Sequence, residues 1–139
     1  MLLEEELSYK VRGCFYGVAN MYGKGLKEVV YEKALAESFK KVGLKFLEQH
    51  RINIYSLETG IKLGTYVPDF IVEGKVVVEI KASSFTRKED LNQQLSYLRC
   101  SIYEIGYLVN FSTAKLDIRR SIFTNDRKPF IAKLQKQNP

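Results

Sequence analysis

Cysteine is scarce in this chain of 139 residues, which carries only Cys14 and Cys100. The two are far apart and form no CxxC pair, so neither a zinc knuckle nor a thiol redox motif is expected. Both lie in segments with helical patterning and are interpreted as buried thiols in a reducing compartment. Long apolar runs are also lacking, since none approaches the roughly 18–20 residues that a membrane span requires.

The start of the chain lacks the basic segment and the apolar stretch of a secretion signal. We therefore expect a cytoplasmic protein, or a nuclear one where the cell has a nucleus, with no membrane partner. Hydrophobic residues make up 45% of the chain and charged residues 27%, the usual balance for a folded domain. A chain of this length can bury a core without disulfides or a structural metal.

Positive charge exceeds negative charge, with 22 Lys and Arg against 16 Asp and Glu and a net charge of +6. Such a field favours polyanions, above all nucleic acid. We predict a single domain over residues 1–124 and a basic, weakly structured tail over 125–139. The tail is either a solvated, frayed terminus or a phosphate-binding segment. The basic residues near this end are Arg119, Arg120, Arg127, Lys128, Lys133 and Lys136.

Apolar residues recur at helical spacing in two stretches, Leu7–Tyr22 and Leu26–Val42. Gly23-Lys24-Gly25 between them permits a tight turn, so the two helices should form an αα-hairpin. The predicted buried stripes comprise Val11, Cys14, Phe15, Val18 and Met21 in the first helix, and Val30, Ala34, Leu35, Ser38, Phe39 and Val42 in the second.

Strand patterns follow Gly43, with β-branched and aromatic residues in rough alternation. Pro68 lies inside one of them and implies an edge, a bulge or a bend, because proline cannot donate to a strand ladder. The expected order is strand, strand, strand, helix, strand and a final strand, over residues 46–57, 62–72, 76–81, 88–103, 105–111 and 117–123. With the two helices before them, these elements predict a mixed α/β sandwich in one domain.

The strands on either side of Glu73-Gly74-Lys75 carry the residues with chemical potential. A three-residue loop sets Val72 opposite Val76, and counting back sets Asp69 opposite Glu79, roughly 5 Å apart at Cβ. A two-residue loop would instead set Asp69 opposite Val78. Because side chains alternate along a strand, Glu79 and Lys81 share one face.

Two neighbouring carboxylates repel each other, and a bound divalent cation relieves that repulsion. Oxygen ligands favour Mg²⁺ or Mn²⁺, which can orient a phosphodiester and lower the pKa of a bound water. Lys81 is then placed to orient that water and to offset negative charge in the transition state. The alternative is a solvated face with an ion pair of little value. An otherwise apolar sheet disfavours that alternative, because unpaired charges are costly there.

Three motifs carry a family resemblance. Pro68-Asp69 followed by Glu79-Ile80-Lys81 matches the PD-(D/E)XK signature, Gly25–Tyr31 fits the pattern GxxExxY, and Gln93–Tyr97 fits the QxxxY element of RecB-like nucleases. The chain thus resembles the GxxExxY protein family of the PD-(D/E)XK nuclease superfamily over about residues 7–123. The resemblance implies a restriction-endonuclease-like core, a mixed β-sheet flanked by helices.

The resemblance also implies roles for particular residues. Asp69, Glu79 and the carbonyl of Ile80 would bind Mg²⁺ or Mn²⁺. The implied catalytic set is Asp69, Glu79, Lys81, Glu28, Gln93 and Tyr97. Plainer interpretations remain open: Glu28 favours a helix N-terminus, Gln94 competes with Gln93 for the same role, and Tyr31 and Tyr97 can be packing residues. Many family members carry a histidine before the glycine turn, where this chain has Ala19-Asn20-Met21.

The expected function is metal-dependent hydrolysis of phosphodiester bonds in DNA or RNA, with DNA the expected substrate. Nucleases of this type often form homodimers so that both strands can be reached. The alternative is a non-catalytic module on a nuclease fold that binds nucleic acid or a protein. A structural component whose acidic hairpin is only surface ranks last, since it leaves the combination of Asp69, Glu79 and Lys81 unexplained.

Overall fold

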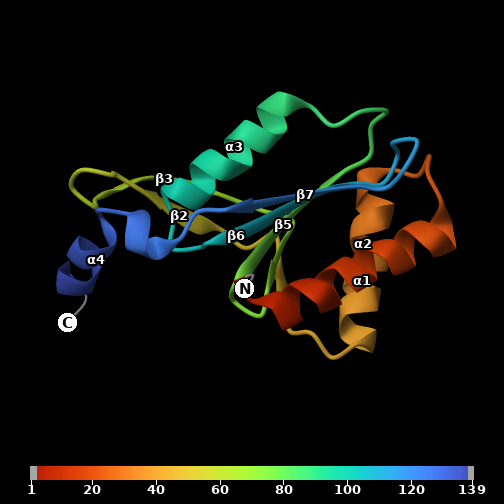
Figure 1. The fold of residues 1–139 in the computed structure, drawn as a ribbon, viewed down its shortest axis with the longest axis horizontal. Helices are drawn as coiled ribbons and strands as arrows, with labels where there is room; N and C mark the ends of the chain where they lie inside the picture. The colour runs from red at the N-terminus through yellow and green to blue at the C-terminus, as the bar shows by residue number, and fades with distance from the viewer. Residues whose placement is uncertain (1–2, 138–139) are drawn as a thin grey trace.

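The computed structural model describes residues 3–137 (Figure 1). Its helices are α1 (Glu5–Tyr22), α2 (Glu28–Lys41), α3 (Lys88–Arg99), the short 3-10 helix η1 (Asn125–Arg127) and α4 (Ile131–Gln137). Its strands are β1 (Phe46–Glu48), β2 (Ile52–Tyr55), β3 (Lys62–Tyr66), β4 (Phe70–Val72), β5 (Val76–Lys81), β6 (Ile105–Asn110) and β7 (Asp117–Ile122).

Five strands form the main sheet, in the order β1-β4-β5-β6-β7, while β2 and β3 form a separate hairpin. Only the central pair β5–β6 is parallel, and the other neighbours in this sheet are antiparallel. A parallel pair needs a long crossover, which α3 supplies between β5 and β6. The predicted fold class is confirmed: a mixed sheet flanked by helices, consistent with a restriction-endonuclease-like fold.

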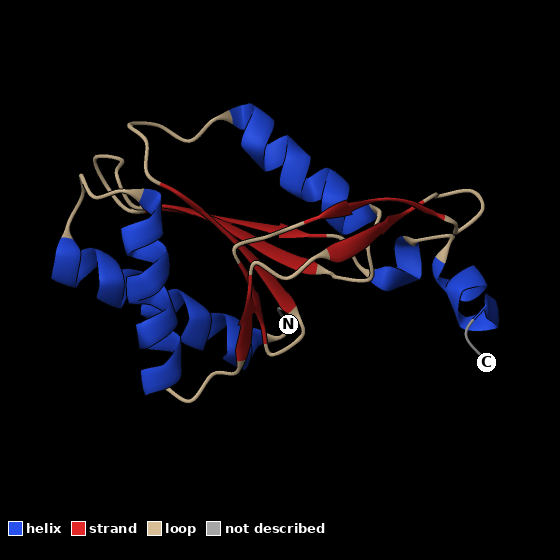
Figure 2. Ribbon diagram, turned by 180° about the vertical axis from the view of Figure 1, so that it is seen from behind, coloured by secondary structure: helices blue, strands red, loops and turns tan. Residues whose placement is uncertain are grey.

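The alternation along β5 distributes its side chains between the two faces of the sheet. Val76, Val78 and Ile80 belong to the core cluster that the buried faces of α1 and α2 complete. Across the other face runs α3, whose Gln94 contacts the backbone of β6. Figures 1 and 2 show α3 on one side of the sheet and the pair α1 and α2 on the other. Glu79 and Lys81 alternate with these core residues along β5, so both of their side chains point to the α3 side of the sheet.

The predicted αα-hairpin is present, but its buried stripes are partly wrong. Met21, Val30 and Val42 are exposed, at 73%, 41% and 49%. The second helix turns a neighbouring face inward and buries Tyr31, whose ring stacks on Phe111 with centroids 4.7 Å apart. Tyr31 is thus a packing residue, and its hydroxyl donates a 2.6 Å hydrogen bond to the carbonyl of Gly23 in the glycine turn.

Two of the three strands predicted before α3 are each divided in two. The first breaks between β1 and β2 around Gln49, which takes a left-handed conformation at φ 51°. The second breaks between β3 and β4 at Pro68, which is buried where the chain passes from the small hairpin into the main sheet. The bend expected from proline is confirmed. The helix predicted over residues 88–103 ends at Arg99.

The expectation of a weakly structured C-terminal segment is wrong for residues 125–137, which form η1 and α4. Phe130 is fully buried and stacks on Tyr55, with centroids 5.6 Å apart. The Lys128 ammonium donates to the carbonyls of Ser101 and Tyr103, at 2.8 and 2.7 Å. Burial of a lysine is tolerated when such acceptors replace water. Residues 138–139 of the predicted tail lie outside the described residues.

None of the helices within residues 3–137 combines the length and the apolar character needed to cross a membrane. Both cysteines are free; Cys14 is buried and Cys100 is half-buried.

Candidate active site

The β4–β5 hairpin has the register that the three-residue turn predicted. Val72 lies opposite Val76 and Phe70 opposite Val78, so Asp69 comes opposite Glu79 one step beyond the paired part. Glu73 and Gly74 take left-handed conformations in the turn, at φ 52° and 65°. The Ile80 amide donates a 2.7 Å hydrogen bond to Asp69 Oδ2, which joins the two strands where their backbone ladder ends.

Asp69 is held by a side chain as well as by the backbone. The side-chain nitrogen of Gln49, Nε2, lies 3.0 Å from Asp69 Oδ1 and 2.9 Å from Glu32 Oε1, so it bridges the two carboxylates. Burial, followed by contact with Glu48 and the charge of Asp69, raises the pKa of Glu32 above its ordinary value. Asp69 is therefore oriented by two donors while its carboxylate oxygens keep free lone pairs.

Glu79 lies in an environment that strongly shifts its pKa. Burial, with the negative charges of Asp69 and Glu28, raises its pKa from 4.5 to about 7, although the Tyr66 hydroxyl and the Lys81 ammonium act in the opposite direction. A carboxyl group with a pKa near neutrality beside another carboxylate is a recurrent property of functional sites. A bound cation would favour the ionised form of Glu79.

Tyr66 connects the small hairpin to the site. Its hydroxyl, at the end of β3, donates a hydrogen bond to Glu79 Oε1. Its ring stacks on Tyr97 of α3, with centroids 4.1 Å apart and planes inclined by 16°. Burial and the nearby charge of Glu79 raise the pKa of Tyr66, so it remains a neutral donor. Tyr97 thus reaches Glu79 through Tyr66.

The remaining predicted residues differ in their placement. Glu28 is the first residue of α2, so its negative charge lies at the favourable end of the helix dipole. The same charge contributes to raising the pKa of Glu79. Gln93 is exposed on α3, and no hydrogen bond within the described part of the chain joins it to Asp69 or Glu79. Its competitor Gln94 is buried and donates to the Tyr107 carbonyl at 2.9 Å, so Gln94 has a packing role.

Sequence reasoning missed Tyr66, Gln49 and Glu32. The only signal for Glu32 was its position four residues after Glu28, one helical turn along the same face. Gln49 follows the end of β1 and Tyr66 ends β3, and the approach of both residues to the site depends on tertiary structure.

The donors present fit a hard divalent cation. Asp69 and Glu79 offer carboxylate oxygens, and the Ile80 carbonyl lies on the same side of β5 as its amide, which points at Asp69. Across residues 3–137, no three His, Cys, Asp or Glu side chains group closely enough to hold a metal ion by themselves. Two carboxylates and one carbonyl, with water completing the shell, match the coordination habits of Mg²⁺.

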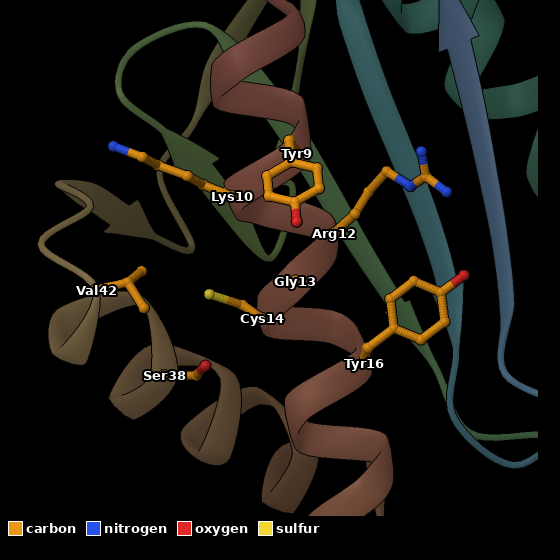
Figure 3. A pocket seen from close by; sticks show the side chains of 8 residues that line it. All are labelled: Tyr9, Lys10, Arg12, Gly13, Cys14, Tyr16, Ser38 and Val42. Atoms are coloured by element: carbon orange, nitrogen blue, oxygen red, sulfur yellow. The ribbon is translucent and has the colours of Figure 1, made fainter.

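A hollow of about 540 Å³ lies elsewhere, between α1 and α2. Figure 3 shows Cys14 of α1 and Ser38 of α2 turned toward each other across it. Burial raises the pKa of the Cys14 thiol, which stays protonated and is poorly suited to attack or to metal binding. The hollow contains none of the predicted site residues.

Comparisons with solved structures give two matches of low similarity. An alkaline exonuclease from Laribacter hongkongensis has 15% sequence identity and a TM-score of 0.44, with 73% of this chain and 63% of the exonuclease covered. The protein SSO0001 has 13% identity and a TM-score of 0.45, with 94% and 83% covered. This chain therefore spans less than two thirds of the exonuclease. No curated protein sequence matches it significantly.

The family comparison covers most of the domain. The PD-(D/E)XK nuclease superfamily matches residues 5–121, from the start of α1 to β7, and so includes the hairpin that carries Asp69, Glu79 and Lys81. The chain belongs to the PD-(D/E)XK nuclease superfamily.

Proposed function

We propose that this protein is a Mg²⁺- or Mn²⁺-dependent nuclease that hydrolyses phosphodiester bonds, with DNA preferred over RNA, and that it belongs to the GxxExxY family. The observation that carries the proposal is the convergence of Asp69 and Glu79 across the end of the β4–β5 pair, with Lys81 beyond them on the same strand. Convergent carboxylates with one perturbed pKa indicate a site built for a cation and for chemistry.

Asp69, Glu79 and the Ile80 carbonyl would hold the metal ion. When bound, the ion would supply charge stabilisation at the phosphoryl oxygens and a water of lowered pKa. Gln49 and the Ile80 amide fix the carboxylate of Asp69 before the ion arrives. Tyr66 does the same for Glu79, so little reorganisation is needed on binding.

Hydrolysis forms a bond from a water oxygen to phosphorus and breaks the bond from phosphorus to one ester oxygen. The products are a phosphate monoester and a free hydroxyl, and the departing oxygen takes up a proton. Lys81 orients the attacking water and offsets the charge that grows on the phosphoryl oxygens. Glu28 adds negative charge at the rim of the site, and Tyr97 fixes the Tyr66 ring. Gln93, exposed on α3, contacts the nucleic-acid backbone. A homodimer of such a domain would reach both strands of a duplex.

The direct test is cleavage of labelled single- and double-stranded DNA and RNA in Mg²⁺, in Mn²⁺ and in EDTA. We expect cutting only with metal. Glu79→Ala removes a proposed metal ligand, so it should lose more than the roughly 10- to 100-fold that removing a hydrogen-bond partner of a ligand costs. Glu37→Ala, on the exposed face of α2, is the matched control and should cut like the wild type. Equal activity in EDTA and Mg²⁺, or an active Glu79→Ala, would refute the proposal.

The net charge of +6 favours a second candidate, a non-catalytic module that binds nucleic acid or a protein on the same fold. This candidate predicts binding to nucleic acid that weakens steeply with salt, without cleavage in any metal. Well-folded protein that binds in about 50 mM salt, releases in about 200 mM and never cuts would select it over the nuclease.

A further inference from the structure

The loop between β5 and α3, residues 82–87, carries a large apolar side chain that is exposed to solvent. Phe85 is 65% exposed and lies four residues after Lys81. Figure 1 shows this loop at the end of the sheet where the β6–β7 loop and the α1–α2 turn also lie. A hydrogen bond from the Gly25 amide to Ser112 Oγ, at 3.4 Å, joins the latter two. A phenylalanine that is mostly exposed buries only a minor part of its apolar area in the free protein, so it contributes little to folding there.

The loop is held in place rather than left free. Asn110, fully buried at the end of β6, accepts from the Ser83 amide at 3.2 Å and donates to Ser83 Oγ at 3.2 Å. Ser83 Oγ in turn donates to the Phe85 carbonyl at 2.9 Å. On the far side of Phe85, Thr86 donates to the Asp117 carboxylate at 2.5 Å. These bonds fix the backbone on both sides of Phe85, which lowers the entropy cost of using its ring for binding.

The three connecting segments at this end of the molecule, residues 23–27, 82–87 and 111–116, contain basic but no acidic residues, while acidic Glu28, Glu89, Asp90 and Asp117 adjoin them. Arg87 and Lys88 come two and three residues after Phe85, and Arg87 makes an exposed ion pair with Glu89, at 3.6 Å. The neighbouring turn and loop add exposed Lys24, Lys27 and Lys115. Exposed cations on the segments near an aromatic side chain match nucleic acid, whose phosphates pair with lysine and arginine while a base stacks on the ring. An apolar protein partner would require no such group of exposed cations on these segments.

We propose that Phe85 is a stacking platform for an unpaired nucleobase next to the cleavage site, so that the substrate is single-stranded nucleic acid or a frayed end. The inference rests on the proposed function and adds the substrate class to it. In an intact duplex each base face is already covered by its neighbours, and proteins reach only base edges and phosphates. A free base face exists in single strands, where stacking on aromatic side chains is the usual means of binding.

The test is fluorescence anisotropy with a labelled oligothymidylate of about 20 nucleotides, longer than the site of a typical single-strand binding fold, and with a 20-base-pair duplex. EDTA is present, so no turnover occurs. Phe85→Ala should bind the single strand about 5- to 150-fold more weakly, the range that corresponds to one stacked base, and the duplex as the wild type does. Phe85→Tyr keeps the aromatic face and should bind within about twofold of the wild type. Tyr9→Ala removes an aromatic side chain that is 80% exposed on α1, and should change nothing.

Single-strand binding by Phe85→Ala equal to that of the wild type would overturn the inference, as would an equal loss for both nucleic acids. Because binding is measured without metal, the outcome is separate from the proposed catalysis. A wild type that never cuts, with Phe85-dependent single-strand binding, would remove the nuclease function and keep the platform. Metal-dependent cutting with no Phe85 effect would do the reverse.

Discussion

At the scale of single residues, the site depends on how Glu79 is surrounded. Its pKa of about 7 reflects opposing contributions, in which burial and Asp69 outweigh the Tyr66 hydroxyl and Lys81. Of these contributions to the pKa of Glu79, the hydrogen bond from Tyr66 can be removed by a substitution that leaves the net charge unchanged. It also links the site to α3, because the Tyr66 ring stacks on Tyr97.

Tyr66→Phe removes the donor to Glu79 and keeps the ring. A hydrogen bond to a charged group contributes about 1.5–3 kcal/mol, so the metal-free pKa of Glu79 should rise above about 7, by roughly one to two pH units. Carboxyl ¹³C NMR of Glu79 across a pH series measures this directly. Tyr97→Phe, which retains the stacking ring, is the control. A midpoint in Tyr66→Phe at or below the wild-type value would show that the hydroxyl does not favour the ionised form.

At the scale of elements, the placement of α3 determines where Tyr97 lies. The helix packs closely on β6 because Gly106 has no side chain: a Cβ there would come within 2.9 Å of Gln94 Cδ. That contact positions the bond from Gln94 to the Tyr107 carbonyl. The glycine is therefore required for a close approach of helix and sheet.

Gly106→Ala should lower the free energy of unfolding by about 1–3 kcal/mol, the usual cost of overpacking. Urea denaturation measures the change. Gly64→Ala is the matched control, since a Cβ at that exposed position on β3 meets nothing within 4 Å. Adding Gln94→Ala should recover part of the loss by making room. If Gly106→Ala proved as stable as Gly64→Ala, the close approach would not limit the placement of α3.

At the scale of the whole molecule, the site makes stability depend on pH and on metal. The pKa of Glu79 is about 7 in the folded protein against an ordinary 4.5, so between these values the folded chain holds a proton that the unfolded chain has lost. The resulting stabilisation is complete below pH 4.5 and disappears as the pH rises through about 7. In EDTA, the wild type should therefore lose stability over this window, by at most about 1.4 kcal/mol for each pH unit.

Glu79→Gln should remove this contribution, so its stability in EDTA should vary less with pH than that of the wild type. Adding Mg²⁺ at about pH 8 should raise the Tm of the wild type, because an ion that binds only the folded state stabilises it. The Tm of Glu79→Gln should respond weakly. Glu37→Gln, on the surface of α2, should follow the wild type in both respects. Parallel pH profiles for wild type and Glu79→Gln would contradict the assigned pKa.

The sequence predicted the fold class and the register of the β4–β5 hairpin, because both follow from local patterns. A three-residue turn sets the register, and the alternation along β5 separates Glu79 from the buried Val78 and Ile80. The membership of Tyr66 and Gln49 in the site could not be predicted in this way. Gln49, just after β1, and Tyr66, at the end of β3, approach Asp69 and Glu79 through tertiary packing, which no local pattern encodes.

The same reason explains the wrong prediction for residues 125–137. Their positive charge is typical of a solvated terminus, yet Phe130 packs on Tyr55 and the Lys128 ammonium binds two carbonyls of the chain after α3. Both contacts join segments far apart in sequence. The buried Phe130 is therefore a better indicator that this segment is folded than its charge composition is.

Asp69, Glu79 and Lys81 are proposed to act together as a catalytic site, and single-turnover cleavage by Lys81→Ala in saturating Mn²⁺ tests this most directly. Lys81 is not a proposed metal ligand, so the variant should fold and bind the ion but cut at least about 100-fold more slowly, as expected on loss of a charge that stabilises the transition state. Lys75→Ala, in the exposed turn of the same hairpin, should cut at the wild-type rate. Wild-type cleavage by Lys81→Ala would contradict the account.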